Sequence, residues 1–306
     1  MAAVAAGPAR ATDGDRPGST ADKVDPQRFG GKPADPAYGA FQRGLYITAL
    51  NLAKPRAEKG DAAAQTLVAE ILSRGLGVKR DDAAAAKWYR LAAEQGIPEA
   101  QFQYALMLID GRYVEKDKKE ALALMQAAAE AGNALAQFNY AQLLVQAEPG
   151  ERGLEQALPY YKRAAQAELA DAQYAMSQIL ANGVGGMKPD DLEARKWLAR
   201  AAHQNFDTAQ LDLGSWMISG RGGERNAKAG FAWLKRAAEG GNVAAQNRVA
   251  KLYMQGIGTE PDTTFAAAWY ILARRAGLFD PVMDDFLNGL TPEELKTAIG
   301  RANRLR

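Results

Sequence analysis

Apolar and small residues recur along this chain with the period of an α-helix, inside a repeat of about 36 residues. An Ala-Gln pair marks each repeat, and the glutamines are Gln65, Gln101, Gln137, Gln173, Gln210 and Gln246. Four of the five steps between them are 36 residues and one is 37, where the loop at residues 183–187 is one residue longer. A repeat of this length is typical of stacked helical hairpins.

The residues after each glutamine predict a first helix. In the second repeat, Tyr104, Ala105 and Leu108 stand three, four and seven positions after the glutamine, and the other repeats have mostly apolar or small residues there. This spacing forms one apolar stripe on a helix. A glycine such as Gly111 follows in most repeats, as expected at a helix C-terminus, where the left-handed conformation is common.

A large side chain about 23 residues after each glutamine predicts a second helix, with an alanine four residues further on the same face. These large residues are Trp88, Leu124, Tyr160, Trp197, Trp233 and Trp269. The spacing of the tryptophans among them, fixed by the repeat, indicates core side chains rather than a sugar-binding strip. Most second helices end at glycine or asparagine, whereas Glu168 holds this position in the third repeat and is predicted to form the weakest cap.

Neither helix of a repeat can bury its apolar stripe alone, so the repeats must stack. The sequence therefore predicts an all-α fold, a right-handed α-solenoid of about six 36-residue helical hairpins with helical caps at both ends. We expect a disordered lead-in at residues 1–37, a capping helix at 38–60, the repeats at 61–277 and capping helices at 278–306. Within the last segment, Thr291-Pro292-Glu293-Glu294 is a capping box.

Composition narrows the classes of function. The 38 basic and 36 acidic residues leave a net charge of +2, without the basic excess typical of nucleic-acid binding. No run of 18 or more apolar residues is present, so no membrane span is predicted. With no cysteine and one histidine, His203, the chain offers no thiolate metal site, disulfide or cysteine nucleophile. We predict no catalytic, cofactor-binding or metal-binding residue, and interpret His203 as a surface or cap side chain.

The N-terminus leaves two interpretations open. Residues 2–11 are small, apolar and free of acidic side chains, and they end on Ala9-Arg10-Ala11, an arrangement that signal peptidases accept. The segment is then the end of an export signal, and the protein is periplasmic or secreted. Alternatively it is a disordered Ala/Pro-rich tail, and the protein is cytoplasmic.

The repeat resembles the Sel-one-like repeat (SLR) family, relatives of the tetratricopeptide repeat. The first repeat carries the family pattern at Ala64-Gln65, Gly75-Leu76-Gly77-Val78, Asp81, Trp88-Tyr89, Ala92-Ala93 and Gly96. Two departures stand out: the third repeat has Glu148-Pro149-Gly150 in place of the Gly-x-Gly loop, and Gly230 replaces the usual helix alanine in the fifth. The resemblance implies a non-catalytic adaptor. In plan the chain is similar to periplasmic regulators of the ExoR type, which restrain a sensor kinase and exopolysaccharide synthesis.

The resemblance also implies where a partner would bind. In tetratricopeptide geometry the first helices line the concave side, and the first and fifth positions after the glutamine point inward. In the middle repeats these positions give the candidate partner-binding residues Phe102, Leu106, Phe138, Gln142, Tyr174 and Gln178. Aromatic rings beside amides suit an extended or helical peptide segment. The alternative is that these aromatic rings pack against adjacent repeats.

Together these features predict a non-catalytic scaffold or regulator in the bacterial cell envelope. It would hold a protein partner, such as a peptide segment or a sensor or envelope protein, in the concave groove. The second hypothesis is an accessory module that binds peptidoglycan or polysaccharide for an envelope enzyme. Exposed aromatic rings lying flat along the groove would favour that second hypothesis, whereas an apolar centre with a polar rim would favour protein binding.

Overall fold

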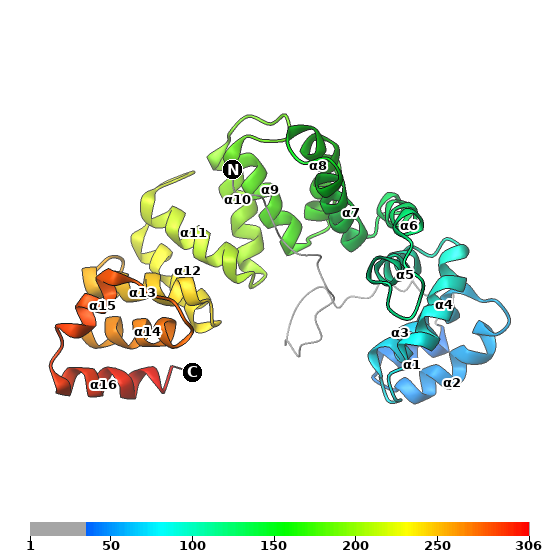
Figure 1. The fold of residues 1–306 in the computed structure, drawn as a ribbon, viewed down its shortest axis with the longest axis horizontal. Coiled ribbons are helices and arrows are strands. Elements are labelled where there is room, and N and C mark those ends of the chain that lie inside the picture. Colours follow the sequence, from blue (N-terminus) through cyan, green and yellow to red (C-terminus); the bar gives the residue numbers. More distant parts are fainter. Residues whose placement is uncertain (1–34, 306) are drawn as a thin grey trace. The chain divides into compact units, whose positions relative to one another are not determined.

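The computed structural model describes residues 35–305, which form sixteen α-helices and no strand within that range (Figure 1). The predicted all-α fold of consecutive helical hairpins is confirmed. The chain divides into two compact units, residues 1–167 and residues 168–306, which we call the N-terminal and the C-terminal unit. The Ala9-Arg10-Ala11 motif and most of the predicted lead-in lie outside the described residues.

The N-terminal unit contains three hairpins behind a helical cap. Its helices are α1 (Pro36–Gln42), α2 (Tyr46–Ala57), α3 (Ala62–Arg74), α4 (Asp82–Glu94), α5 (Pro98–Asp110), α6 (Lys118–Glu130), α7 (Ala134–Ala147) and α8 (Glu151–Gln166). The cap has two helices where one was predicted, because Gly44 adopts a left-handed conformation (φ 74°) that separates α1 from α2.

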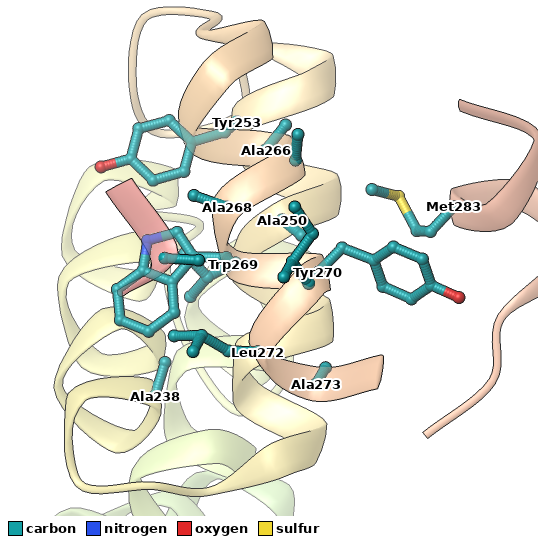
Figure 2. Close-up of a cluster of buried hydrophobic side chains, with 14 of the residues drawn as sticks. Ala238, Ala250, Tyr253, Ala266, Ala268, Trp269, Tyr270, Leu272, Ala273 and Met283 are labelled. Atoms are coloured by element: carbon teal, nitrogen blue, oxygen red, sulfur yellow. The ribbon is translucent and has the colours of Figure 1, made fainter. Parts of the chain in front are cut away.

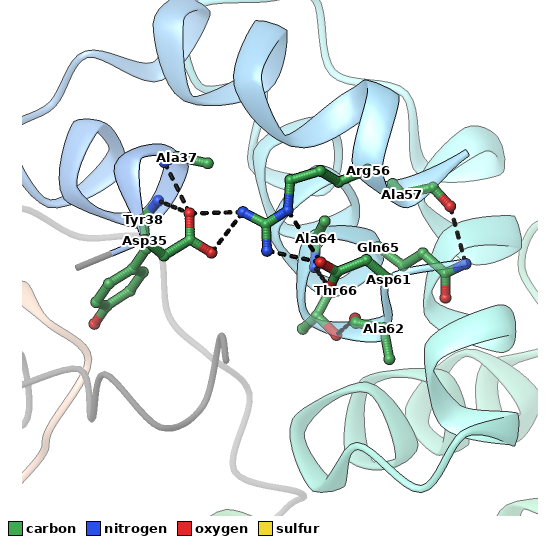
Figure 3. A network of polar contacts seen from close by, with 10 residues as sticks. All are labelled: Asp35, Ala37, Tyr38, Arg56, Ala57, Asp61, Ala62, Ala64, Gln65 and Thr66. Atoms are coloured by element: carbon green, nitrogen blue, oxygen red, sulfur yellow. Dashed lines mark hydrogen bonds and ion pairs between the residues drawn. The ribbon is translucent and has the colours of Figure 1, made fainter. Parts of the chain in front are cut away.

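Polar contacts fix this cap to the first repeat (Figure 3). Asp35 caps α1, since its Oδ1 accepts the backbone N–H of Ala37 at 2.9 Å. Arg56 on α2 then donates to Asp35 at 2.8 Å and to Asp61, the N-cap of α3, at 2.7 Å. One guanidinium group therefore joins the N-termini of two helices, and α1 begins at Pro36, inside the segment predicted as lead-in.

The C-terminal unit contains three further hairpins and two capping helices. Its helices are α9 (Ala170–Asn182), α10 (Asp191–His203), α11 (Asp207–Ser219), α12 (Ala227–Glu239), α13 (Val243–Gln255), α14 (Thr263–Arg275), α15 (Pro281–Asn288) and α16 (Pro292–Ala302). The predicted capping box is present: Thr291 and Glu294 exchange side-chain and backbone hydrogen bonds at the start of α16. It anchors the last helix, which packs on α14.

The repeated glutamine has a structural role that explains its spacing. In five of the six repeats its Nε2 donates to the carbonyl oxygen eight residues earlier, near the C-terminus of the preceding helix. The pairs are Gln65 with Ala57 (3.1 Å), Gln101 with Ala93 (3.5 Å), Gln137 with Ala129 (3.0 Å), Gln210 with Ala202 (3.0 Å) and Gln246 with Ala238 (3.3 Å). The last carbonyls of a helix have no partner within it. The glutamine supplies one and ties consecutive hairpins together.

The deepest side chains of the second helices lie one position after the large residues that mark them. These are Tyr89, Met125, Tyr161, Leu198, Leu234 and Tyr270, none of them more than 5% exposed. Trp197 and Trp269 are also buried, as predicted, and Figure 2 shows Trp269 beside Tyr270 in the core of the C-terminal unit.

Trp88 and Trp233, predicted as core residues, are only half-buried, although Trp88 packs against the hydrophobic core of the N-terminal unit. Trp233 instead contacts His203 of α10 edge-on, with ring centroids 5.0 Å apart. It therefore joins two neighbouring second helices, α10 and α12, at their surface.

The unusual glycine of the fifth repeat is explained by close helix packing. A Cβ atom on Gly230 of α12 would lie 2.5 Å from the carbonyl oxygen of Gly214, and a Cβ atom on Gly214 of α11 would lie 2.7 Å from that of Gly230. Both distances are shorter than real contacts. The two glycines therefore face each other and let α11 and α12 approach more closely than two alanines would.

Candidate functional site

In the N-terminal unit, the predicted partner-binding residues belong mostly to the core. Phe102 and Phe138 expose 1% and 2% of their surface. The Phe138 ring meets Tyr161 of its own hairpin edge-on, with centroids 5.7 Å apart. Gln142 is buried and Leu106 is half-buried. The alternative that the sequence left open was packing against adjacent repeats, whereas the contact of Phe138 with Tyr161 lies within one hairpin. The burial of both phenylalanine rings leaves them no exposed face for a partner.

In the C-terminal unit, the other two predicted residues converge on a carboxylate. The Tyr174 hydroxyl donates to Oδ2 of Asp212 at 3.0 Å, and Nε2 of Gln178 donates to the same oxygen at 3.4 Å. Tyr174 and Gln178 lie one turn apart on α9, and Asp212 lies on α11. All three are half-buried, so they form a polar surface site shared by two first helices.

The Asp212 carboxylate is held by neutral donors and lacks an ion pair among the described residues. Burial raises its pKa, and the hydrogen bonds from Tyr174 and Gln178 and the more distant charge of Arg221 only partly oppose this effect. Arg221 itself pairs with Asp191 at 2.7 Å and lies over the Trp216 ring. The hydrogen bonds from Tyr174 and Gln178 both reach Oδ2, so among the described residues Oδ1 of Asp212 is left to accept another donor.

An aromatic contact involves one residue of this site, Tyr174. The Phe206 ring, from the N-cap position of α11, packs on the Tyr174 ring with centroids 5.2 Å apart and planes tilted by 38°. Burial also raises the pKa of Tyr174 far above its ordinary value, with the Asp212 charge as the next cause, so the hydroxyl stays protonated. The site therefore combines a permanent O–H donor, an amide, a carboxylate and apolar ring surface.

The sequence interpretation found Tyr174 and Gln178 but missed Asp212, which stands two positions after its glutamine. A signal was present: Asp212 is an acidic residue between Leu211 and Leu213, inside the apolar stretch of a first helix. An acid in that setting cannot be fully solvated, and it therefore needs hydrogen-bond donors from a neighbouring helix. Only the structure identifies α9 as their source.

The described residues show no arrangement that suggests another chemistry. No three Asp, Glu or His side chains between residues 35 and 305 gather closely enough to hold a metal ion. His203 is exposed and rests on Trp233, as expected for a surface side chain. In the same range, no helix is both long and apolar enough to cross a membrane.

Comparison with known proteins supports the interpretation of the repeats. A Sel1 repeat protein of known structure from Oxalobacter formigenes is 30% identical, with a TM-score of 0.65, and the match covers 83% of this chain and 77% of that one. A protective antigen of uropathogenic Escherichia coli displaying an SLR fold is 26% identical, with a TM-score of 0.57, over 85% of this chain and 64% of the other.

A curated relative, chitin synthase regulatory factor 3 of Schizosaccharomyces pombe, is 36% identical over 83 residues. That match spans 26% of this chain and 9% of the yeast protein. The family model described as Sel1 repeat matches residues 62–97, 98–133, 134–169, 170–206, 208–242 and 243–278. Since these matches run almost without interruption along the hairpins, the chain belongs to the Sel1 repeat family.

Proposed function

We propose that this protein is a non-catalytic scaffold that binds a segment of a partner protein at Tyr174, Gln178 and Asp212. Sel1 repeat proteins are typically protein-interaction scaffolds, which supports the general class. The main support is the half-buried Asp212 carboxylate, which accepts hydrogen bonds from Tyr174 and Gln178 and has no ion pair among the described residues.

The energetics of Asp212 favour a binding role over a structural one. A carboxylate whose pKa is raised by burial destabilises the folded state when it is ionised. Buried charges are usually compensated by a charged partner as well as by hydrogen bonds, whereas among the described residues Asp212 has neutral donors only. A partner that donates to the carboxylate regains the lost solvation, and charge-assisted hydrogen bonds are the stronger kind.

The aromatic surfaces of the C-terminal unit favour a protein partner over a polysaccharide. Sugar binding requires an open ring face, but arginine side chains lie over Trp197 and Trp216 at 4.4 and 4.1 Å from the ring centroids. A surface hollow of about 500 Å³ near the ends of α12 and α14 is lined by residues such as Val243, Gln246 and Leu272, and its lining includes no aromatic ring. We therefore propose a protein partner, and the cross-linking experiment described next would also detect a polysaccharide ligand.

Photo-cross-linking in the native host tests the proposal. Asn182 is exposed and lies one turn beyond Gln178 on α9, so a photoreactive amino acid at residue 182 would report on the site without replacing part of it. We expect a light-dependent protein adduct that Asp212→Asn weakens at least about tenfold, the loss of roughly 1.4 kcal/mol. The same label at Lys119, exposed in the N-terminal unit, is the matched control.

Two outcomes would contradict the proposal. An adduct at residue 182 that Asp212→Asn leaves unchanged would place the binding surface elsewhere on the protein. An adduct with a glycan instead of a polypeptide would favour the polysaccharide hypothesis.

We further propose that the protein works in the bacterial cell envelope, as the Ala9-Arg10-Ala11 motif and the similarity in plan to ExoR-type regulators suggest. If the motif is a cleavage site, the mature chain begins at Thr12. N-terminal sequencing of protein from the native host tests this expectation. Retention of residues 1–11 in a cytoplasmic fraction would remove the envelope assignment and leave the binding proposal intact.

A further inference from the structure

We infer that the partner segment presents a lysine or arginine side chain to Asp212. This inference rests on the proposed function and specifies the chemistry of the partner. It comes from comparison with a second carboxylate of the C-terminal unit, Asp280, which caps the N-terminus of α15 and is paired with Lys251.

The two carboxylates receive side chains from the same two positions of the preceding first helix. Asn247 and Lys251 stand one and five residues after Gln246, as Tyr174 and Gln178 stand after Gln173. Nδ2 of Asn247 donates to Oδ2 of Asp280 at 2.9 Å, and Nζ of Lys251 forms an ion pair with the same oxygen. At Asp280 the fifth position therefore supplies a positive charge from within the chain.

At Asp212 the fifth position is Gln178, which supplies a hydrogen bond and no charge. The consequence is seen in the two acids. The bond from Lys251 lowers the pKa of Asp280, whereas burial raises the pKa of Asp212. The same two donor positions thus supply a cation to Asp280, which the N-terminus of α15 stabilises further, and only neutral donors to Asp212.

The missing component is a cation, and the surroundings of Asp212 suit one on an apolar stem. Oδ1 of Asp212 accepts no hydrogen bond from the described residues. The Tyr174 ring, whose hydroxyl bonds the carboxylate, packs on the half-buried Phe206 ring, and apolar ring surface of this kind accommodates lysine and arginine stems. Aromatic faces also attract the charged group itself. A neutral amide from a partner would complete the hydrogen bonding and leave the charge uncompensated.

Selection from a random peptide library displayed on phage tests this inference with the full chain as bait. We expect the wild-type protein to enrich peptides with lysine or arginine at one fixed position, at least about tenfold over the unselected library. Asp212→Asn keeps the size of the side chain and should lose this preference. Asp285→Asn removes the same charge from an exposed site on α15 and should keep it.

A second variant supplies Asp212 with a cation from the protein's own chain. Gln178→Lys recreates at Asp212 the pairing that Lys251 makes with Asp280, so it should fold normally and lose the basic preference. Because this variant retains the Asp212 carboxylate, it separates loss of binding from loss of folding, which circular dichroism checks for each protein.

The outcomes distinguish the inference from the proposed function. Enrichment of peptides without a fixed basic residue, or of the same basic peptides by Gln178→Lys, overturns the inference while the scaffold proposal stands. Failure of the wild-type protein to enrich any peptide contradicts the scaffold proposal, and the inference falls with it.

Discussion

The first helices of the two units use the same repeat position in opposite ways. One residue after the glutamine, the N-terminal unit places Phe102 and Phe138, both fully buried. The C-terminal unit places Tyr174 there, half-buried, with its hydroxyl bonded to Asp212. A buried tyrosine hydroxyl needs a hydrogen-bond partner, whereas a phenylalanine ring does not. The hydroxyl oxygen of Tyr174, which the phenylalanines lack, therefore makes this position part of a polar candidate site.

This difference shows that a repeat position determines where a side chain lies along the helix but does not determine whether the residue packs in the core or forms a polar contact. The role depends on the neighbouring helix, because Phe138 packs against the Tyr161 ring whereas the Tyr174 hydroxyl donates a hydrogen bond to Asp212. We therefore expect substitutions at matching positions to change stability in the N-terminal unit and binding in the C-terminal unit.

The largest effect should come from Phe138→Ala. Removal of a fully buried phenylalanine costs about 3–5 kcal/mol of unfolding free energy. In a repeat protein the loss should be concentrated in the hairpins that contact the substituted residue. Urea unfolding followed by circular dichroism measures it, together with limited proteolysis of the N-terminal unit.

The matched change in the C-terminal unit is Tyr174→Phe, which removes only the hydroxyl that bonds Asp212. It should cost roughly 1 kcal/mol of stability or less, the usual net value of one hydrogen bond, while partner cross-linking falls. Equal losses of stability from the two variants would erase the distinction between the units. So would a Phe138→Ala protein that unfolds like the wild type.

A loss smaller than that of Phe138→Ala is expected at the glycine contact between α11 and α12. Gly230→Ala introduces a Cβ atom where the Gly214 carbonyl oxygen lies, so we expect a cost of about 1–3 kcal/mol from overpacking. Gly300→Ala on α16 is the control, because a Cβ atom there meets nothing within 4 Å. That control should be neutral or stabilise by up to about 1 kcal/mol, since alanine is the better helix former. Thermal melting compares them, and a stabilised Gly230→Ala protein would refute the close contact.

The two carboxylates of the C-terminal unit should respond to pH with opposite signs. The pKa of Asp212 is raised above the ordinary value of 3.8, so its ionised form destabilises the fold, and the penalty grows as pH rises through its folded-state pKa. The pKa of Asp280 is lowered, so its contribution is present above 3.8 and is lost as pH falls through its folded-state pKa.

At neutral pH, Asp212→Asn should therefore stabilise the protein and Asp280→Asn should destabilise it, each by on the order of 1 kcal/mol. Both differences should shrink toward pH 3, where the carboxyl groups of the unfolded chain are largely protonated. Melting temperatures between pH 3 and pH 7 provide the measurement. A destabilised Asp212→Asn protein at pH 7 would show that the carboxylate is structural.

Much of the fold was predictable because several independent features of the sequence indicate the same structure. The 36-residue spacing, the apolar stripes and the terminal glycines all specify hairpins, and the structure contains them. The N-terminal cap was less predictable, because the break at Gly44 and the Asp35–Arg56 pair lie outside the repeat.

The site was predictable only in part. Alignment with a related geometry identified Tyr174 and Gln178, but it could not distinguish them from Phe102 and Phe138, because positions along a helix do not reveal what the neighbouring helix offers. The same limit explains Trp88 and Trp233, which the spacing placed in the core. Trp197 and Trp269 are buried at the same repeat position, so the surroundings of each helix decide which of these tryptophans reaches the core.

The smallest expected effect concerns the boundary residue Glu168, the first residue of the C-terminal unit. It adopts a left-handed conformation with φ 64°, where Gly96 and Gly132 stand in the preceding repeats and Asn205 in the next. This conformation costs a residue with a Cβ atom about 1–2 kcal/mol, less for asparagine, whereas glycine adopts it freely but loses more entropy on folding. Glu168→Gly should therefore stabilise the protein by about 0.5–1 kcal/mol, and Asn205→Gly should change stability less. Thermal melting of the two variants measures this ranking, and equal shifts would mean that the glutamate at the third cap carries no strain beyond that of asparagine.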